Sequence, residues 1–343
     1  MPGLLEPIDR WRAGVVDWAS FGAVNLLQRR HPPPRDFRAQ WNAYARRCDG
    51  LSVEEFYTIP DGYAWPAWPE DPHARWRFPT PDPGDIDGNN HAGFDLYPCA
   101  DGWSRAPTMI LAHGWMSVSD FGYKLWARRL NEVGWNAVFM HLPYHYSRRL
   151  PGHLHGEYAI NAHLIRVAEG IRQAVLELKV LVGRLKERGC PLVGGWGTSY
   201  GGWIMGMAAC VIPELQRLVL VEPILDVHDA IWNTPASVTI RRELRKLGIG
   251  PEDTQPQMRL CCPSHSRPHA AGGHILLIAG VWDRIASPEK IHALQQAWPG
   301  SHYAEYKQGH VGYTLMPQSF RRAQELWPED FHGLETDEAA AAA

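Results

Sequence analysis

From residue 108 onward, short apolar segments alternate with segments whose apolar residues recur every three or four positions. The apolar segments are residues 108–112, 136–142, 192–195, 218–221, 274–279 and 302–306. The segments of helical spacing between and after them are residues 121–133, 160–188, 202–211, 288–298 and 318–326. Strands that alternate with helices are joined by right-handed crossovers, so this order predicts an α/β fold with a mostly parallel sheet flanked by helices.

The rest of the chain divides around this alternating core. Residues 1–72 read as an amino-terminal, partly helical extension, with helical spacing at 4–28 and 37–47 and no chemistry of their own. We expect one α/β domain over residues 73–334, entered through short strands at 74–78 and 92–97. Residues 223–273 interrupt the alternation and are predicted to form an inserted cap or lid between two strands. The tail, residues 335–343, ends in five alanines and is expected to be disordered.

Charge and cysteine content exclude several classes of protein. The chain has 34 Lys and Arg against 37 Asp and Glu, a net charge of −3, which does not favour nucleic-acid binding. No apolar run approaches the 18 or so residues of a membrane-spanning helix, and the start of the chain does not resemble a secretion signal. The six cysteines are scattered without a C-x-x-C pair, so we expect buried free thiols, no metal site and a cytoplasmic protein.

The most informative motif is Gly197-Thr198-Ser199-Tyr200-Gly201, which lies between a predicted strand and a predicted helix. It matches G-x-S-x-G in the strand-turn-helix context that a nucleophilic serine requires, because the sharp turn tolerates only small residues on either side. The helix that follows directs its N–H groups and the positive end of its dipole toward developing negative charge. Ser199 is therefore the candidate nucleophile.

A serine hydroxyl requires a base, and the base requires an orienting acid. Asp283 follows the predicted strand at 274–279, and His310 lies in a glycine-flanked loop after the strand at 302–306. The order Ser, Asp, His along the chain differs from the orders of chymotrypsin and subtilisin. Asp226 and Glu222, just past the preceding strand, are the alternative acids, and Asp283 is favoured over both.

A second glycine-containing motif, residues 111–116, includes the end of the strand at 108–112 and the loop directly after it. Its Trp115 N–H is predicted to join the Tyr200 N–H in an oxyanion hole, where one donor typically contributes about 10²–10³ in turnover. His113 is expected to brace this loop.

These four motifs together resemble the α/β-hydrolase superfamily, in its serine esterase and lipase branch, over about residues 73–328. The resemblance implies Ser199 as nucleophile, His310 as general base, Asp283 as its partner, and the amides of Trp115 and Tyr200 as oxyanion donors. It also implies that no cofactor takes part. The long amino-terminal extension departs from the family pattern.

Substrate contacts are predicted around these motifs. Trp203 and Trp282 lie within four residues of a predicted catalytic position, and together with Trp115 they suggest a partly aromatic wall. His113 is also a candidate contact. His145 belongs to a histidine-rich loop whose spacings fit no metal site, and we expect it, Arg148 or Arg149 either to contact substrate or to lie in a solvated loop.

The predicted function is a serine hydrolase that cleaves small carboxylic esters through an acyl-enzyme. Hydrolysis of amides, thioesters or carbon–carbon bonds on the same triad is an alternative that the sequence barely separates from it. A non-catalytic α/β-hydrolase scaffold used for binding is the alternative from another class.

Overall fold

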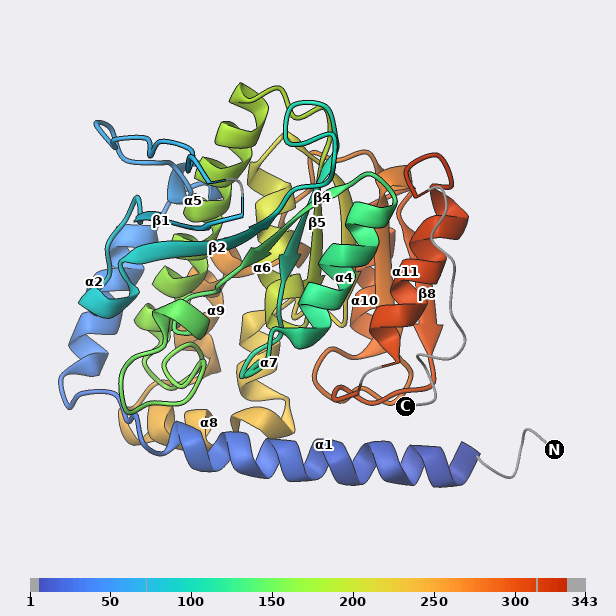
Figure 1. The fold of residues 1–343 in the computed structure, drawn as a ribbon. Helices are drawn as coiled ribbons and strands as arrows, with labels where there is room; N and C mark the ends of the chain where they lie inside the picture. The colour runs from blue at the N-terminus through green and yellow to red at the C-terminus, as the bar shows by residue number, and fades with distance from the viewer. Residues whose placement is uncertain (1–5, 72, 313, 332–343) are drawn as a thin grey trace.

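A computed structural model describes residues 6–71, 73–312 and 314–331, and its centre is an eight-stranded sheet (Figure 1). The strands are β1 (Arg75–Pro79), β2 (His91–Tyr97), β3 (Thr108–Ala112), β4 (Asn136–Met140), β5 (Val193–Thr198), β6 (Leu215–Val221), β7 (Ile275–Gly280) and β8 (His302–Tyr306). Their spatial order is β1-β2-β4-β3-β5-β6-β7-β8. The pairings of β2 with β1 and with β4 are antiparallel and all others are parallel, so the prediction of a mostly parallel sheet is confirmed.

The central strands are apolar because both faces of the sheet are covered. Every residue of β3, β4 and β7 is buried, which explains why these segments read as continuous apolar runs without alternation. At one edge, β8 is only partly buried and carries polar residues such as His302 and Glu305. At the other edge, β1 alternates exposed and buried positions as an antiparallel edge strand does.

Helices pack on both faces of the sheet (Figure 1). α4 (Phe121–Glu132) and α11 (Leu315–Leu326) cover one face, where Phe320 stacks on Trp126 and on Trp196 of β5. The other face is covered by α5 (Leu164–Glu187), α6 (Tyr200–Val211) and α10 (Pro288–Ala297). α5 and α6 contribute most to this core because they are apolar on more than one side.

The segment between β6 and β7 contains three further helices, α7 (Val227–Trp232), α8 (Val238–Lys246) and α9 (Pro251–Met258), joined by short 3₁₀ turns. The sequence has helical spacing at 227–232 and 238–247, where α7 and α8 form. After them it is rich in Pro, His and Cys and predicts a loop, but α9 forms there in a stretch with two prolines. Pro251 occupies the first turn, a position where its missing N–H costs nothing.

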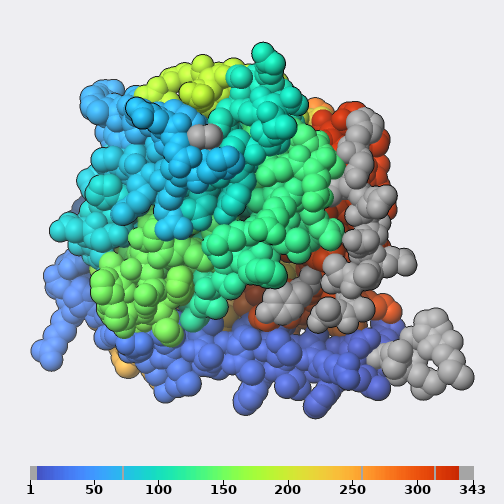
Figure 2. Space-filling model, viewed as in Figure 1, coloured from blue at the N-terminus to red at the C-terminus, as the bar shows by residue number. Residues whose placement is uncertain are grey.

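The amino-terminal segment forms α1 (Glu6–Gln28), α2 (Phe37–Cys48) and the short α3 (Val53–Phe56). α1 is a long helix that runs along one end of the molecule, below the carboxyl ends of the parallel strands and beside α8 (Figures 1 and 2). Asn25 joins the two regions, because its side chain donates to the carbonyl of Pro235 at 2.9 Å and accepts from the N–H of Thr239 at 2.8 Å.

Two predictions about the limits of the fold stay predictions. The division of the chain near residue 72 is not tested by the contacts, and the predicted tail 335–343 lies outside the described residues.

Within the described ranges, no helix has both the length and the apolar character needed to cross a membrane.

Arg148 was expected to lie in a solvated loop or at the substrate, and that expectation is wrong. Its side chain is fully buried and forms two hydrogen bonds with Glu177 of α5, at 2.6 and 2.9 Å. It also donates to the carbonyl of Asn89 at 2.8 Å. The ion pair therefore ties the loop after β4 to the core helix, and burial raises the pKa of Glu177.

Replacing Arg148 with Met should cost about 3 kcal/mol of unfolding free energy, because it leaves a buried carboxyl without its partner. Urea denaturation measures this loss. The exposed neighbour Arg149 offers a matched control, and Arg149→Met should change stability by less than about 0.5 kcal/mol. Equal effects of the two substitutions would show that the pair does not stabilise the fold.

Candidate active site

Ser199 lies at the turn between β5 and α6, with φ +51° and ψ −110°. This backbone conformation is rare for a residue with a side chain and is stabilised only by its surroundings. The glycines on either side permit it. A Cβ at Gly197 would lie 2.3 Å from the carbonyl oxygen of Gly201, and a Cβ at Gly201 would lie 2.3 Å from that of Ala112. The sequence motif therefore reflects close backbone packing between β5, α6 and the end of β3.

A chain of hydrogen bonds connects Ser199, His310 and Asp283. The Oγ of Ser199 lies 2.9 Å from Nε2 of His310, and Nδ1 of His310 lies 2.7 Å from Oδ2 of Asp283. Because the carboxylate only accepts, Nδ1 carries the proton and Nε2 is left to accept from the serine hydroxyl. Asp283 itself is held by the N–H groups of Ile285 and Ala286, at 2.7 and 3.0 Å from its Oδ1.

The electrostatics of this chain favour a basic histidine. Burial opposes the charged imidazolium, but the charge and hydrogen bond of Asp283, together with the charge of Asp17, outweigh it and raise the pKa of His310. The arrangement can take a proton from Ser199 and stabilise the imidazolium that results.

The alternative acids lie in different places. Asp226 caps α7, accepting from the N–H of Asp229 at 3.0 Å. Glu222 is buried after β6 with a positive φ of 47°, and its carboxyl lies in one cluster with Asp283 and His310, their ligand atoms all within 4.8 Å. Burial raises the pKa of Glu222 well above its usual value, and the charges of Asp283 and Asp17 raise it further. Burial and the neighbouring charges thus both favour the protonated form of Glu222 beside the carboxylate of Asp283.

The two predicted oxyanion donors lie on opposite sides of the serine turn. Trp115 follows β3, and a Cβ built at the neighbouring Gly114 would lie 3.8 Å from Cβ of Ser199. Tyr200 begins α6 directly after the serine. Among the described residues, neither the Trp115 N–H nor the Tyr200 N–H donates a hydrogen bond within the chain, so both are free for a ligand oxygen.

His113 and His145 lie behind the loop after β3. His113 accepts from the N–H of Leu142 at 3.3 Å, and His145 accepts from the N–H of Met116 at 3.2 Å. Both rings are fully buried, and burial lowers the pKa of His145 to about 3 and that of His113 well below its usual value. These neutral histidines support the loop, and neither of them, although both were predicted to contact substrate, lines the cavity beside Ser199.

A cavity of about 390 Å³ opens beside Ser199 and His310. Its lining is mainly apolar and comes from α1, the start of α5 and the segment between β6 and β7; the side chains include Phe21, Val24, Ile160, Leu164, Val167, Trp203, Val227, Ile231 and Ile240. Residues of 224–240, the first part of the segment between β6 and β7, thus line the cavity. That the whole segment 223–273 forms a cap stays a prediction. A cavity of this size and character suits a small apolar ligand group.

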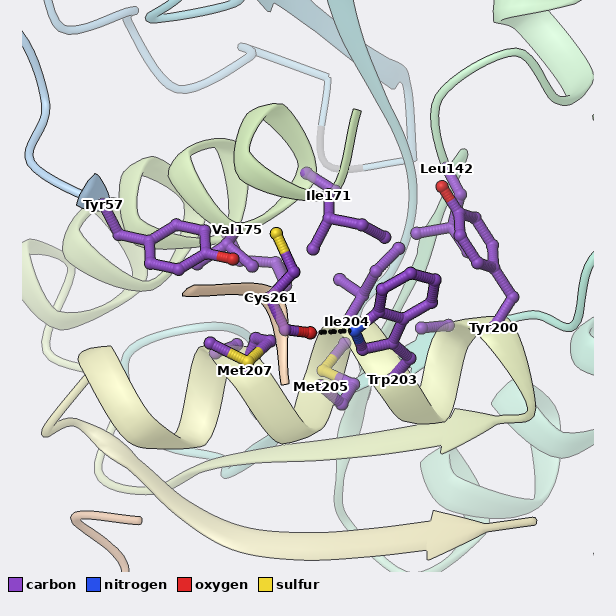
Figure 3. Close-up of a cluster of buried hydrophobic side chains, with 14 of the residues drawn as sticks. Tyr57, Leu142, Ile171, Val175, Tyr200, Trp203, Ile204, Met205, Met207 and Cys261 are labelled. Atoms are coloured by element: carbon purple, nitrogen blue, oxygen red, sulfur yellow. Dashed lines mark hydrogen bonds between the residues drawn. The ribbon is translucent and has the colours of Figure 1, made fainter. Parts of the chain in front are cut away.

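The tryptophans near the site divide between its two sides. Trp115 and Trp203 line the cavity, and the indole N–H of Trp203 donates to the carbonyl of Cys261, which orients the ring toward α5 (Figure 3). Trp196 faces the opposite side of the sheet, and Trp282 lies with Trp11 in a separate surface groove. The wall is therefore mainly aliphatic, with the rings of Trp115, Trp203 and Phe21 among its side chains, whereas Trp282, which the sequence suggested as part of it, lies outside this lining.

Sequence reasoning missed the contribution of α1. Phe21 and Val24 line the cavity, and Asp17 accepts hydrogen bonds from the loop that carries His310. One signal was present, since Asp17 is the one charged residue in the stretch 13–27, which forms most of α1. A lone carboxylate of this kind requires a partner when it is buried.

Two clusters within the described ranges bring three ligand-type side chains together. One is Glu222, Asp283 and His310, whose contacts are given above. In the other, Oε1 of Glu157 lies 2.7 Å from His31 and 3.3 Å from His153. Arg30 approaches the same oxygen at 3.2 Å, which supplies the positive charge that a cation would bring.

No protein-family model matches this sequence, and no curated protein is similar to it. Its fold is similar to that of several solved hydrolases. Acetyl xylan esterase 1 from Thermoanaerobacterium sp. JW/SL YS485 is 17% identical, with 86% of this chain and 95% of that chain covered and a TM-score of 0.51. The acetyl xylan esterase from Paenibacillus sp. R4 is 15% identical, with 87% and 98% covered and a TM-score of 0.50.

The acylaminoacyl peptidase of Pyrococcus horikoshii is also similar, with 16% identity and a TM-score of 0.52. The match covers 75% of this chain but 40% of the peptidase, so the chain spans less than half of that protein. At these identities the likeness concerns the fold.

The neutral Glu222 predicts an unusual pH dependence of stability. The folded chain keeps this proton above pH ~4.3, where an unfolded glutamate loses it, so the folded state binds more protons and its stability falls as pH rises. Glu222→Gln removes the titration, and it should raise Tm by about 2 °C at pH 8, corresponding to roughly 1 kcal/mol, and by less at pH 5.

Scanning calorimetry at the two pH values measures this effect. Glu214→Gln, at an exposed position just before β6, is the control. It should change Tm only slightly, and by the same amount at pH 5 and at pH 8. A lower Tm for Glu222→Gln at pH 8 would mean that Glu222 is charged in the fold.

Proposed function

We propose that this chain, which has the α/β-hydrolase fold, is a serine hydrolase that cleaves carboxylic esters through an acyl-enzyme at Ser199. The observation that carries the proposal is the hydrogen-bonded chain from Ser199 to His310 to Asp283 at the wall of an apolar cavity. The similar folds of two acetyl xylan esterases support the same reaction class.

In the first half-reaction, Nε2 of His310 takes the hydroxyl proton while Oγ of Ser199 attacks the ester carbonyl carbon. The carbonyl oxygen becomes an oxyanion, and the free N–H groups of Trp115 and Tyr200 are the donors proposed to bind it. Collapse of this intermediate breaks the bond to the alcohol oxygen, which receives the proton from His310. Water, deprotonated by His310, then attacks the acyl-enzyme, and the acid leaves as Ser199 regains its proton.

Asp283 has two proposed tasks in this sequence. It fixes the tautomer in which Nε2 accepts, and its negative charge stabilises the imidazolium. Two N–H donors hold one of its oxygens, so the other stays directed at His310. The neutral Glu222 beside it avoids a second charge that would repel Asp283.

The cavity supports an apolar acyl or alcohol group as the recognised part of the substrate. Its lining extends from Ser199 to Ile231 and Ile240 of the cap and to Phe21 of α1. Burying each methylene there is worth about 0.8 kcal/mol, so esters longer than acetate should bind better.

All six cysteines are unpaired and buried, which supports the cytoplasmic placement predicted from the sequence.

Ser199→Ala should lower hydrolysis of p-nitrophenyl butyrate by at least about 10³-fold, because it removes the nucleophile. A fluorophosphonate probe should add one adduct to the wild-type chain, with the mass shift located on the peptide that contains Ser199. The p-nitroanilide of the same acid distinguishes ester from amide cleavage. A folded wild-type chain that neither reacts with the probe nor cleaves esters, anilides or thioesters would support the binding-scaffold alternative.

Ile231→Trp should narrow the cavity and reduce kcat/KM for p-nitrophenyl octanoate by about tenfold or more, with little effect on the acetate ester. Val238→Trp adds the same ring at an exposed position of the same segment and is the control. If Ile231→Trp instead lowered kcat/KM equally for the octanoate and the acetate ester, with Tm unchanged, the acyl group would not bind in this cavity.

A further inference from the structure

The loop that carries His310 is held by a side chain nearly 300 residues earlier in the sequence. Asp17 of α1 is 2% exposed. Its Oδ2 accepts from the N–H of His310 at 3.0 Å, and its Oδ1 accepts from the N–H of Val311 at 2.9 Å. Both carboxylate oxygens thus accept hydrogen bonds from two successive backbone N–H groups, those of His310 and Val311.

The fit of the loop around Asp17 is close. A Cβ at Gly309 would lie 2.6 Å from Oδ2 of Asp17, so no larger residue fits there without displacing the carboxylate or the loop. The glycine before His310 is therefore explained by the approach of α1. On the other side, the carbonyl of Gln308 accepts from the N–H of Trp282 at 2.9 Å, which ties the same loop to the turn that bears Asp283.

Contacts elsewhere along α1 fix the position of Asp17. Near one end of the helix Glu6 pairs with Lys307 at 3.0 Å, in the same loop region. Toward the other end Asn25 binds Pro235 and Thr239, and Gln28 donates to the carbonyl of Ala236 at 3.2 Å. The helix is thus attached to both the His310 loop and the cap.

Three carboxyl groups surround the imidazole of His310. Asp283, from the loop after β7, binds Nδ1, and Glu222, after β6, lies in the same cluster as a neutral acid. Asp17 approaches from α1 and binds the backbone of His310. Asp283 supports the ring, whereas Asp17 supports the main chain from which the ring extends, and its charge acts on the imidazolium from a second direction.

We propose that Asp17 is a positioning residue for His310, which aligns the imidazole with Ser199 and stabilises its protonated form during turnover. This inference rests on the proposed function, because it assigns Asp17 a part in the step that His310 performs. It makes the amino-terminal helix a component of the active site. If Asp17 only anchored α1 to the rest of the fold, its replacement would lower the stability of the protein and leave the pKa of His310 unchanged.

Asp17→Asn tests the proposal with little change in size. Asparagine keeps one oxygen for one N–H but has no charge. We expect kcat for p-nitrophenyl butyrate to fall about tenfold, because the His310 backbone loses part of its support and the imidazolium loses a nearby negative charge. KM should change little, since Asp17 does not line the cavity.

The pH profile separates positioning from anchoring. Activity requires neutral His310, so it is lost as pH falls through the raised pKa of this residue. Without the charge of Asp17 that pKa is lower, so the acidic limb of kcat/KM should move to lower pH. Asp9→Asn, at an exposed position on the same helix, is the control and should leave kcat and the limb as in wild type.

Gly309→Ala provides a second, independent variant, because its Cβ would displace the carboxylate while leaving the charge on the chain. Gly309→Ala should lower kcat, and it should shift the acidic limb of kcat/KM by less than Asp17→Asn does. The wild-type chain first has to cleave the ester and react with the fluorophosphonate; if it does neither, the proposed function fails. If wild type is active and either folded variant, Asp17→Asn or Gly309→Ala, retains the wild-type kcat and acidic limb, Asp17 has no positioning role.

Discussion

The close approach of three backbone segments around Ser199 is the constraint on which the rest of the site depends. The carbonyl oxygens of Gly201 and Ala112 lie only 2.3 Å from where Cβ atoms of Gly197 and Gly201 would be, so β5, α6 and the end of β3 meet without side chains between them. This contact holds the serine backbone at a positive φ and brings the loop of Trp115 alongside it. Pairing in the sheet then determines where the segments after β6, β7 and β8 begin.

The carboxyl edge of the sheet concentrates charge in a small volume. Glu222 follows β6, Asp283 follows β7 and His310 follows β8, and Asp17 arrives from α1. Three carboxyl groups around one imidazole would repel one another if all were ionised. The burial of Glu222 favours its protonated, uncharged form, and N–H groups donate hydrogen bonds to Asp283 and Asp17.

Much of the fold followed from local patterns. β3 and β8 have the predicted bounds, and β4, β5, β6 and β7 differ by a few residues at their ends. The order Ser, Asp, His pointed to three side chains that the structure brings within hydrogen-bonding distance. These features depend on strand periodicity and on chain order, which a single sequence displays. Their catalytic roles stay proposals.

The features that were missed depend on contacts between distant segments. Arg148 looks like any loop arginine until Glu177 is placed beside it, and Asp17 looks like a surface acid until the His310 loop is placed against α1. α9 contains two prolines and a run of polar residues, so local propensity argued against it, and packing against α7 and α2 outweighs that propensity. Sequence periodicity reports which face of an element is buried but not what covers it.

The hydrogen bonds between Asp17 and residues 310 and 311 also have a consequence for how the protein is made. The partners of Asp17 are added to the growing chain 293 and 294 residues after it. At synthesis rates of about 5–20 residues per second, α1 waits roughly 15–60 s for them. During that interval the apolar inner face of the helix, including Phe21 and Leu27, lacks its final packing. A growing chain of this kind remains exposed to chaperones and proteases at this helix until residues 310 and 311 have been translated.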